Sequence, residues 1–215
     1  MRRYTTVLFD LDGTLIDSIR LILDSYHHTF AVHGLPACAD DMLLRGVGTP
    51  LRTQLSGYSD DPAAVLAMIE TYRAYNLAHH DTCVRPYPGA VACVRALVER
   101  GVKVAIVTSK NRHSTERGLE VSGLTGVFPV LVCADDVTNP KPHKEPVDLA
   151  LARLGALHGE AIFVGDSLHD MHAGRSAGVA TGAALWGPLS REDLAPSEPS
   201  HWLDKPEDLL PLVLG

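Results

Sequence analysis

Short hydrophobic runs alternate with amphipathic stretches along most of this sequence. The runs that are typical of buried β-strands are Thr6 to Phe9, Val102 to Val107, Val130 to Cys133, Ala161 to Val164 and Ala180 to Ala184. The stretches with helical periodicity are Ala90 to Arg100, Arg112 to Val121, Glu145 to Leu154, His169 to Ala177 and a short one near Lys205 to Leu210. Repeated strand–helix units indicate a parallel sheet with helices on both faces. We therefore predict an α/β fold whose core is a Rossmann-like, doubly wound parallel sheet.

One long segment interrupts this alternation. Between Asp17 and about Thr82 the pattern contains helices, the longest being Asp17 to Phe30 and Pro62 to His80, but no convincing strand. The segment Pro86-Tyr87-Pro88-Gly89 then marks the return to the strand–helix pattern. We therefore expect two domains: a Rossmann-like core of residues 1–16 and 83–215, and a small helical cap domain of residues 17–82 that is inserted after the first strand.

Composition and charge exclude several classes of partner. The chain has 215 residues, of which 46% are hydrophobic, so it can bury a substantial core. It carries 19 Lys and Arg against 26 Asp and Glu, a formal net charge of −7. This excess argues against broad non-specific binding to nucleic acid or to anionic membranes, because affinity for a phosphate backbone needs clustered cations. A small phosphorylated metabolite remains compatible as a partner, since it needs only a local pocket.

The sequence also bears on where the protein resides. Its four cysteines, at positions 38, 83, 93 and 133, form no CxxC pair, which favours free thiols in a reducing compartment. The first apolar stretch is short and is interrupted by Asp10, unlike a signal peptide, and no apolar run approaches the ~18 residues of a membrane span. We expect a soluble cytoplasmic protein, either a monomer or a homodimer.

Polar residues that can carry chemistry follow four of the predicted strands. They are Asp10, Asp12, Gly13 and Thr14 after the first strand, Thr108, Ser109 and Lys110 after the second, Lys141 after the third strand and its loop, and Asp166 and Asp170 after the fourth. Open parallel sheets bind ligands at the carboxyl ends of their strands. We therefore expect these residues to converge on one edge of the sheet.

This set of residues suits the hydrolysis of a phosphate monoester. A carboxylate such as Asp10 can attack phosphorus and split one slow reaction into two faster steps, provided that a cation reduces the repulsion between two anions. Asp10 and Asp166 offer the oxygen ligands that Mg²⁺ prefers. Asp12 is a candidate to protonate the leaving oxygen and then to activate water. Thr108, with the next backbone N–H, and Lys141 are candidates to bind the phosphoryl oxygens.

Four motifs in this chain resemble those of the haloacid dehalogenase superfamily. They are DLDGT from Asp10 to Thr14, the Thr108-Ser109 pair, the Lys141-Pro142 dipeptide, and GDSxxD from Gly165 to Asp170. Their order and strand context match over nearly the whole chain. The resemblance implies an aspartyl-phosphate mechanism with Mg²⁺ as cofactor, and a helical cap of the superfamily's first type that opens and closes over the site.

The resemblance also assigns roles to residues. It implies Asp10 as nucleophile and metal ligand, Asp12 as general acid and base with its backbone carbonyl on the metal, and Asp166 as a further metal ligand. Asp170 is expected to orient the metal site through water or Lys141. The residues expected to bind the phosphate of the substrate are Gly13, Thr108, Ser109 and Lys141.

Details narrow the resemblance within the superfamily. The carboxylate at Asp12 favours phosphoryl chemistry over dehalogenation, and Thr14 is similar to phosphatases rather than to β-phosphoglucomutases. The run from Asn139 to Val147 resembles phosphoglycolate phosphatases and related bacterial pyrophosphatases. Lys144 stands where many relatives have proline, which leaves open whether it or Lys141 points inward. We favour Lys141, because it occupies the Lys-Pro position.

Substrate choice is expected to depend on the cap. Arg45 and Arg52 flank the segment 46–51 and are candidates to bind a second anionic group of the substrate. We predict a Mg²⁺-dependent phosphatase acting on a small organic phosphate such as 2-phosphoglycolate. Pyrophosphate, a nucleotide or a sugar phosphate are alternative substrates, and a phosphosugar mutase or a non-catalytic phosphometabolite-binding protein are alternative functions.

Two other interpretations, a zinc site and a serine esterase, are weaker. Histidines at positions 27, 28, 79, 80, 169 and 172 raise the question of zinc, but no HExxH motif or Cys/His set with zinc spacing is present. The tetrapeptide Gly165 to Leu168 spells the signature of GDSL esterases, in which the serine is the nucleophile. Those enzymes need a later Asp-x-x-His, and Glu198 to His201 imitates it only weakly.

Overall fold

A six-stranded sheet lies at the centre of the larger part of the protein. The computed structural model describes residues 4–215. The strands of the sheet are β1 (Thr6–Phe9), β4 (Lys103–Val107), β5 (Val130–Val132), β6 (Ala161–Gly165), β7 (Ala180–Ala184) and β8 (His201–Leu203). Their order in the sheet is β5-β4-β1-β6-β7-β8, and every neighbouring pair is parallel. This arrangement confirms the predicted α/β fold, and it places the polar segments that follow β1, β4 and β6 beside one another.

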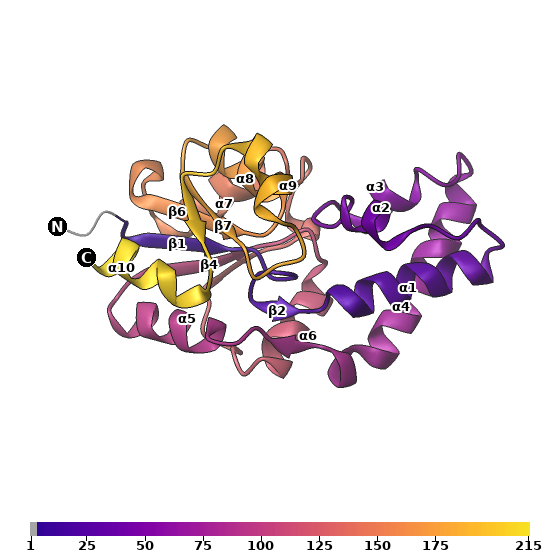
Figure 1. The fold of residues 1–215 in the computed structure, drawn as a ribbon, viewed down its shortest axis with the longest axis horizontal. Coiled ribbons are helices and arrows are strands. Elements are labelled where there is room, and N and C mark those ends of the chain that lie inside the picture. The colour runs from indigo at the N-terminus through magenta and orange to yellow at the C-terminus, as the bar shows by residue number, and fades with distance from the viewer. Residues whose placement is uncertain (1–3) are drawn as a thin grey trace.

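Helices cover both faces of the sheet, as Figure 1 shows. The helices on one face are α5 (Ala90–Glu99), α6 (Arg112–Val121) and α10 (Leu209–Leu214), and those on the other are α7 (Glu145–Leu154) and α8 (Leu168–Ser176). Successive side chains of a strand point to opposite faces. In β1, Val7 and Phe9 accordingly join the first hydrophobic cluster, and Leu8 joins the second.

The C-terminal region contains one element that the hydrophobic pattern does not predict. Strand β8 has only three residues, so it is too short for an alternation to be visible, and it is specified by pairing with β7. The remaining short elements are α9 (Arg191–Leu194) and 3₁₀ turns at Ala134–Asp136, His158–Glu160, Ala195–Ser197 and Pro206–Asp208. The C-terminal helix expected near residue 205 begins with the last of these turns and continues as α10.

Four helices lie between residues 19 and 83, beyond the carboxyl ends of the strands (Figure 1). These cap helices are α1 (Ile19–Val32), α2 (Asp40–Leu44), α3 (Leu51–Leu55) and α4 (Pro62–Cys83). They enclose a hydrophobic cluster of their own: Leu23, Tyr26, Phe30, Leu43, Leu55, Val65, Met68 and Ile69. The chain enters and leaves them through an antiparallel pair, β2 (Ile16–Asp17) and β3 (Arg85–Pro86), which lies next to the domain boundaries that the sequence predicts.

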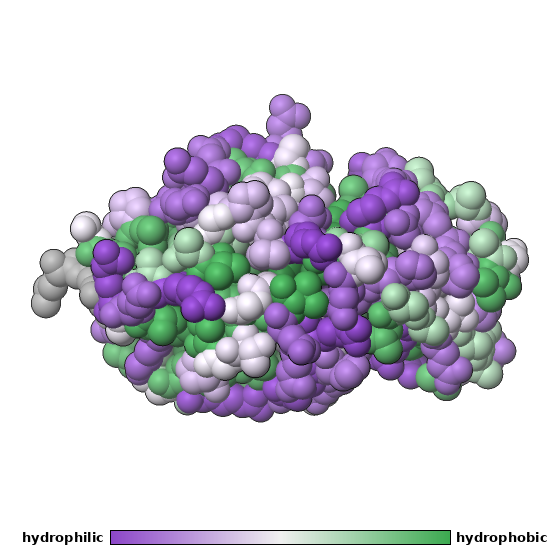
Figure 2. Space-filling model, turned by 90° about the horizontal axis from the view of Figure 1, so that it is seen from below, coloured by the Kyte–Doolittle hydropathy of each residue, from purple (hydrophilic) through white to green (hydrophobic). Residues whose placement is uncertain are grey.

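The surface and the helix lengths agree with the composition. Most of the face in Figure 2 is hydrophilic, and hydrophobic residues form patches on it. Within residues 4–215, none of the helices combines the length and the apolar character that a membrane span requires. All four cysteines have free thiols.

Candidate active site

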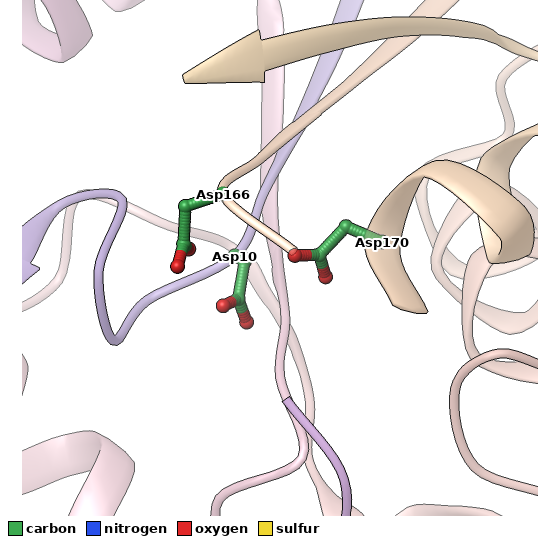
Figure 3. Close-up of side chains that lie close together, drawn as sticks. All are labelled: Asp10, Asp166 and Asp170. Carbon is green, nitrogen blue, oxygen red and sulfur yellow. The ribbon is translucent and has the colours of Figure 1, made fainter. Parts of the chain in front are cut away.

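Three aspartates meet at the carboxyl ends of adjacent strands. Asp10 follows β1, where its backbone N–H donates to the carbonyl of Val164 at 2.9 Å, and Asp166 follows β6. Asp170 comes from the first turn of α8. Carboxylate oxygens of Asp10, Asp166 and Asp170 lie within 4.8 Å of one another, and all three side chains are buried (Figure 3). The first and the last of the four sequence motifs are thus brought together.

Lys141 supplies the ammonium group of this cluster. Its Nζ donates to Oδ1 of Asp10 at 2.8 Å, to Oδ1 of Asp170 at 2.6 Å and to the carbonyl of Val107 at 3.3 Å. The Lys141 side chain is 1% exposed, whereas Lys144 is 53% exposed and pairs with Asp148. Lys141 is therefore the lysine that points inward.

The cluster has more negative than positive charge. Burial raises the pKa of Asp10 to about 7, with the charge of Asp170 adding to the effect and Lys141 opposing it. Burial and the charge of Asp10 raise the pKa of Asp166 well above its ordinary value. Burial alone would lower the pKa of Lys141, but the attraction of Asp10 and Asp170 outweighs it and raises that pKa. A divalent cation would supply the missing positive charge, so the oxygen donors fit a hard metal ion such as Mg²⁺.

The loop after β1 is shaped around Asp166. Thr14 Oγ1 donates to Oδ1 of Asp166 at 2.6 Å. Gly13 has a φ of +82°, and a Cβ atom there would lie 2.3 Å from Oδ2 of Asp166. The N–H of Gly13 donates to the carbonyl of Ile16 at 2.9 Å. In this structure Gly13 thus gives Asp166 room, while its own N–H stabilises the loop.

Asp12 has a cation partner, Lys110, which the sequence placed at this edge of the sheet without giving it a role. Lys110 Nζ donates to Oδ1 of Asp12 at 2.6 Å, and Ser18 Oγ donates to the same oxygen at 2.5 Å. Burial alone would raise the pKa of Asp12, but the charge and hydrogen bond of Lys110 outweigh burial and lower it. The sequence signal for Lys110 is that it directly follows Thr108 and Ser109.

The segment after β4 joins the core to the cap. Thr108 Oγ1 accepts from the N–H of Lys110 at 3.2 Å, and its side chain is 5% exposed. Ser109 Oγ donates to the carbonyl of Gly48 at 2.5 Å. Gly48 belongs to the segment between α2 and α3, so this bond connects the cap with the edge of the sheet that carries Asp10.

Ser167 is a helix cap in this structure. Its Oγ donates to Oδ2 of Asp170 at 2.6 Å, and it accepts from the Asp170 N–H at the start of α8. His201, the partner that a serine esterase would need, instead contacts the Tyr4 hydroxyl at 2.9 Å, near the amino end of β1. His201 therefore does not act as a base for Ser167, and this geometry does not favour the esterase.

A cavity of about 1030 Å³ lies between the aspartates and the cap helices. The core residues of the predicted site that line it are Asp10, Asp12, Thr108, Ser109 and Asp166. Of the two arginines expected to contact substrate, Arg52 lines the cavity, whereas Arg45 is exposed and lies outside its lining. Arg73 of α4 also lines the cavity and was not predicted.

Among residues 4–215, the histidines lie outside the group of side chains that could share a metal ion. Within residues 4–215, the one group of three His, Cys, Asp or Glu side chains that is close enough to share an ion is Asp10, Asp166 and Asp170. The zinc alternative therefore has no support from the described part of the chain.

Comparisons with known proteins agree with this geometry. A family model described as haloacid dehalogenase-like hydrolase matches residues 7–184. The chain is 42% identical over 208 residues to the pyrophosphatase PpaX of Anoxybacillus flavithermus, covering 97% of this chain and 96% of that protein. It is 41% identical over 211 residues to PpaX of Bacillus cereus, covering 98% of this chain and 97% of that protein. A crystal structure of a predicted phosphoglycolate phosphatase from Haemophilus somnus matches with a TM-score of 0.88 at 23% identity, over 99% of both chains, and thus supports the fold.

Proposed function

Because the chain belongs to the haloacid dehalogenase-like hydrolases, we propose that it is a Mg²⁺-dependent phosphatase that works through an aspartyl-phosphate on Asp10. The sequence predicted an enzyme of phosphatase type, and the family match and the names of the relatives agree with that class. One observation carries the mechanistic proposal: the buried side chains of Asp10, Lys141 and Asp166 lie together beside a cavity large enough for a substrate.

The metal would be held by the carboxylates of Asp10 and Asp166 and by the backbone carbonyl of Asp12. When bound, Mg²⁺ supplies positive charge that reduces the repulsion between the nucleophile and an anionic phosphate. Lys141 contributes charge at the same place, because it donates to Asp10 and Asp170 at once. Asp170 in turn holds Lys141 beside the nucleophile.

The chain's own groups provide the two chemical steps. Asp10 attacks phosphorus and the bond from phosphorus to the leaving oxygen breaks. That oxygen takes the bonding electrons and, where the substrate is an organic monoester, a proton from Asp12, and the phosphoryl group remains on Asp10. Thr108 and Lys141 would hold the phosphoryl oxygens. Asp12 then removes a proton from water, which attacks phosphorus and releases phosphate and free Asp10. The ionised state that Lys110 favours for Asp12 suits this second step.

Pyrophosphate becomes a strong second candidate beside 2-phosphoglycolate. Both substrates carry a second anionic group, for which Arg52 and Arg73 are available: among residues 4–215, neither side chain has an ion-pair or hydrogen-bond partner. Lys110, 2.6 Å from Asp12, would stabilise negative charge on the leaving oxygen. This favours a leaving group that is already an anion, such as the second phosphate of pyrophosphate. The relatives named pyrophosphatase add weight to it.

A panel of phosphorylated compounds tests the proposal. Phosphate release is measured for pyrophosphate, 2-phosphoglycolate, glucose 1-phosphate and AMP, with Mg²⁺ and with EDTA. We expect release that depends on Mg²⁺ and is fastest for pyrophosphate or 2-phosphoglycolate. Dominant isomerisation of glucose 1-phosphate would indicate a mutase. Binding without turnover across the panel would indicate a phosphometabolite-binding protein.

A further inference from the structure

The cavity above Asp10 is larger than an inorganic phosphate substrate requires. Its volume is about 1030 Å³. Pockets of about 300–1,000 Å³ typically enclose drug-sized organic molecules. Pyrophosphate consists of two phosphorus and seven oxygen atoms, so it fills only a small part of this space. The question is what the remaining wall is suited to contact.

One face of α4 forms much of that wall. The α4 residues that line the cavity are Leu66, Ile69, Glu70, Tyr72, Arg73, Asn76, Leu77 and His80. Their spacing of three and four positions defines a single helix face. With a rise of about 1.5 Å per residue, the face extends roughly 21 Å from His80 to Leu66. The wall is therefore long as well as continuous.

At the inner end of this face, His80 is buried and lines the cavity together with Lys110 and Asp12. Burial lowers the pKa of His80, and the charges of Lys110 and Asp12 also act on it. Leu77 lies one turn further from that end, and Arg73 lies one more turn along. A substrate whose phosphorus is at Asp10 would therefore direct its leaving group past Lys110 and along α4.

The face also carries two accessible leucines, one on each side of Glu70 and Arg73. Leu77 is 42% exposed and Leu66 is 46% exposed, and both line the cavity that contains Asp10. Ile22 of α1 and Leu51 of α3 line the same cavity from the other cap helices. Neither a second phosphate nor a carboxylate gains by contact with these side chains, because they offer no hydrogen bond. An apolar substituent on the leaving group would gain.

We propose that this site also hydrolyses the terminal phosphate of organic diphosphates whose apolar substituent lies against the α4 face. This inference rests on the proposed phosphatase function and extends its substrate class. Asp10 attacks the terminal phosphorus, the bridging oxygen leaves with the electrons of the broken bond, and the product is the monophosphate of the substituent. Water then cleaves the aspartyl-phosphate and releases phosphate. Lys110 and Arg73 face the anionic middle of the substrate, and the apolar substituent continues toward Leu66.

A series of n-alkyl diphosphates from ethyl to hexyl tests this inference, with kcat/KM measured for each and expressed relative to pyrophosphate. Chain length changes apolar contact while the leaving group stays an alkyl phosphate throughout. Complete burial of a methylene corresponds to at most about a four-fold gain in kcat/KM. We expect a rise of about two-fold or more per methylene over part of the series. A flat or falling series would overturn the inference, since it would mean that the cap closes on the compact anion alone.

Two leucine variants locate the effect. Leu66→Asn replaces an apolar contact on the α4 face, and Leu157→Asn makes the same change at a 67% exposed leucine outside the cavity lining. We expect Leu66→Asn to reduce the gain per methylene by at least half and Leu157→Asn to leave it unchanged. Equal effects of the two variants would contradict the role of α4. If pyrophosphate and every other phosphate failed as substrates, the proposed function itself would fail and this inference with it.

Discussion

The carboxylate cluster and the α4 face border the same cavity but are built in opposite ways. Asp10, Asp170 and Lys141 are almost fully buried, and each contacts a partner of opposite charge at 2.8 Å or less. Arg73 and Leu77 of α4 are exposed to the cavity, and Arg73 has no ion-pair partner within the part of the chain that the structure describes.

This difference indicates which property each region controls. Buried charges depend on their neighbours, so a substitution in the cluster is expected to change stability and chemistry together. Exposed groups contribute little to the folded state, so substitutions on α4 are expected to change substrate preference with little change in stability. The predictions below test this separation, beginning with the largest expected effect.

Asp10→Asn removes the nucleophile and keeps the shape of the side chain. We expect turnover of every substrate to fall by about 10⁴-fold or more, since loss of a nucleophile is among the largest single effects known in enzymes. Thermal unfolding of the variant serves as the control for folding. Turnover within ten-fold of the wild type, in a folded variant, would refute covalent catalysis by Asp10.

Lys141→Met leaves two buried carboxylates, those of Asp10 and Asp170, without their ammonium partner. We expect the free energy of unfolding, measured by urea at neutral pH in EDTA, to fall by about 3 kcal/mol or more. The additional substitution Asp170→Asn removes one of the carboxylates that Lys141 neutralises and should restore part of the loss. An unchanged urea midpoint in Lys141→Met would show that the cluster does not depend on this charge.

Arg52→Ala and Arg73→Ala test the cap side of the comparison. Each removes a charged donor for a second anionic group, so kcat/KM for pyrophosphate should fall by about ten-fold. The loss should be smaller for methyl phosphate, which has no second anion. Arg20→Ala is the matched control, because Arg20 is exposed on α1 and lies outside the cavity lining. Equal losses for both substrates would contradict the assignment.

Asp136 is a carboxylate outside the catalytic cluster that has both hydrogen-bond and ion-pair partners. Its substitution should have the smallest effect of this series on the free energy of unfolding. Burial would raise its pKa, but the Cys133 N–H, Arg153 and Arg112 outweigh burial and lower the pKa below 3.8. Because the folded state prefers the ionised form of Asp136, ionisation of this group stabilises the fold. The stabilisation is complete at pH values above the pKa of Asp136 in the unfolded chain, and it is lost as the pH falls through the lowered pKa of the folded state. We expect Asp136→Asn to cost about 1 kcal/mol at neutral pH, with a difference from wild type that shrinks in acid. A constant difference down to pH 2 would contradict this linkage.

The position of a candidate site residue could be predicted from the sequence wherever that residue comes directly after a strand. Asp10, Thr108 and Asp166 come immediately after β1, β4 and β6, so the hydrophobic run before each residue was enough to place it at one edge of the sheet. Lys141 was harder, because eight residues separate it from the end of β5, and only the Lys-Pro motif distinguished it from Lys144.

Contacts between separate loops could not be predicted from the sequence. The pairing of Lys110 with Asp12 joins positions 98 residues apart, and no local pattern encodes it. Arg45 and Arg52 are equivalent by sequence, yet a turn between α2 and α3 directs only Arg52 to the cavity. Arg73 lies in the middle of a helix whose cavity-facing side is defined only by how α4 packs on α1.

The most direct test of the account is to trap the intermediate. Enzyme that is turning over pyrophosphate with Mg²⁺ is quenched in acid, and intact-mass and peptide mass spectrometry locate any added phosphoryl group. We predict one phosphoryl group per chain at Asp10 in a fraction of the molecules, and none in Asp10→Asn. Full turnover with no phosphoryl group at Asp10 at any quench time, or with the group on another residue, would contradict it.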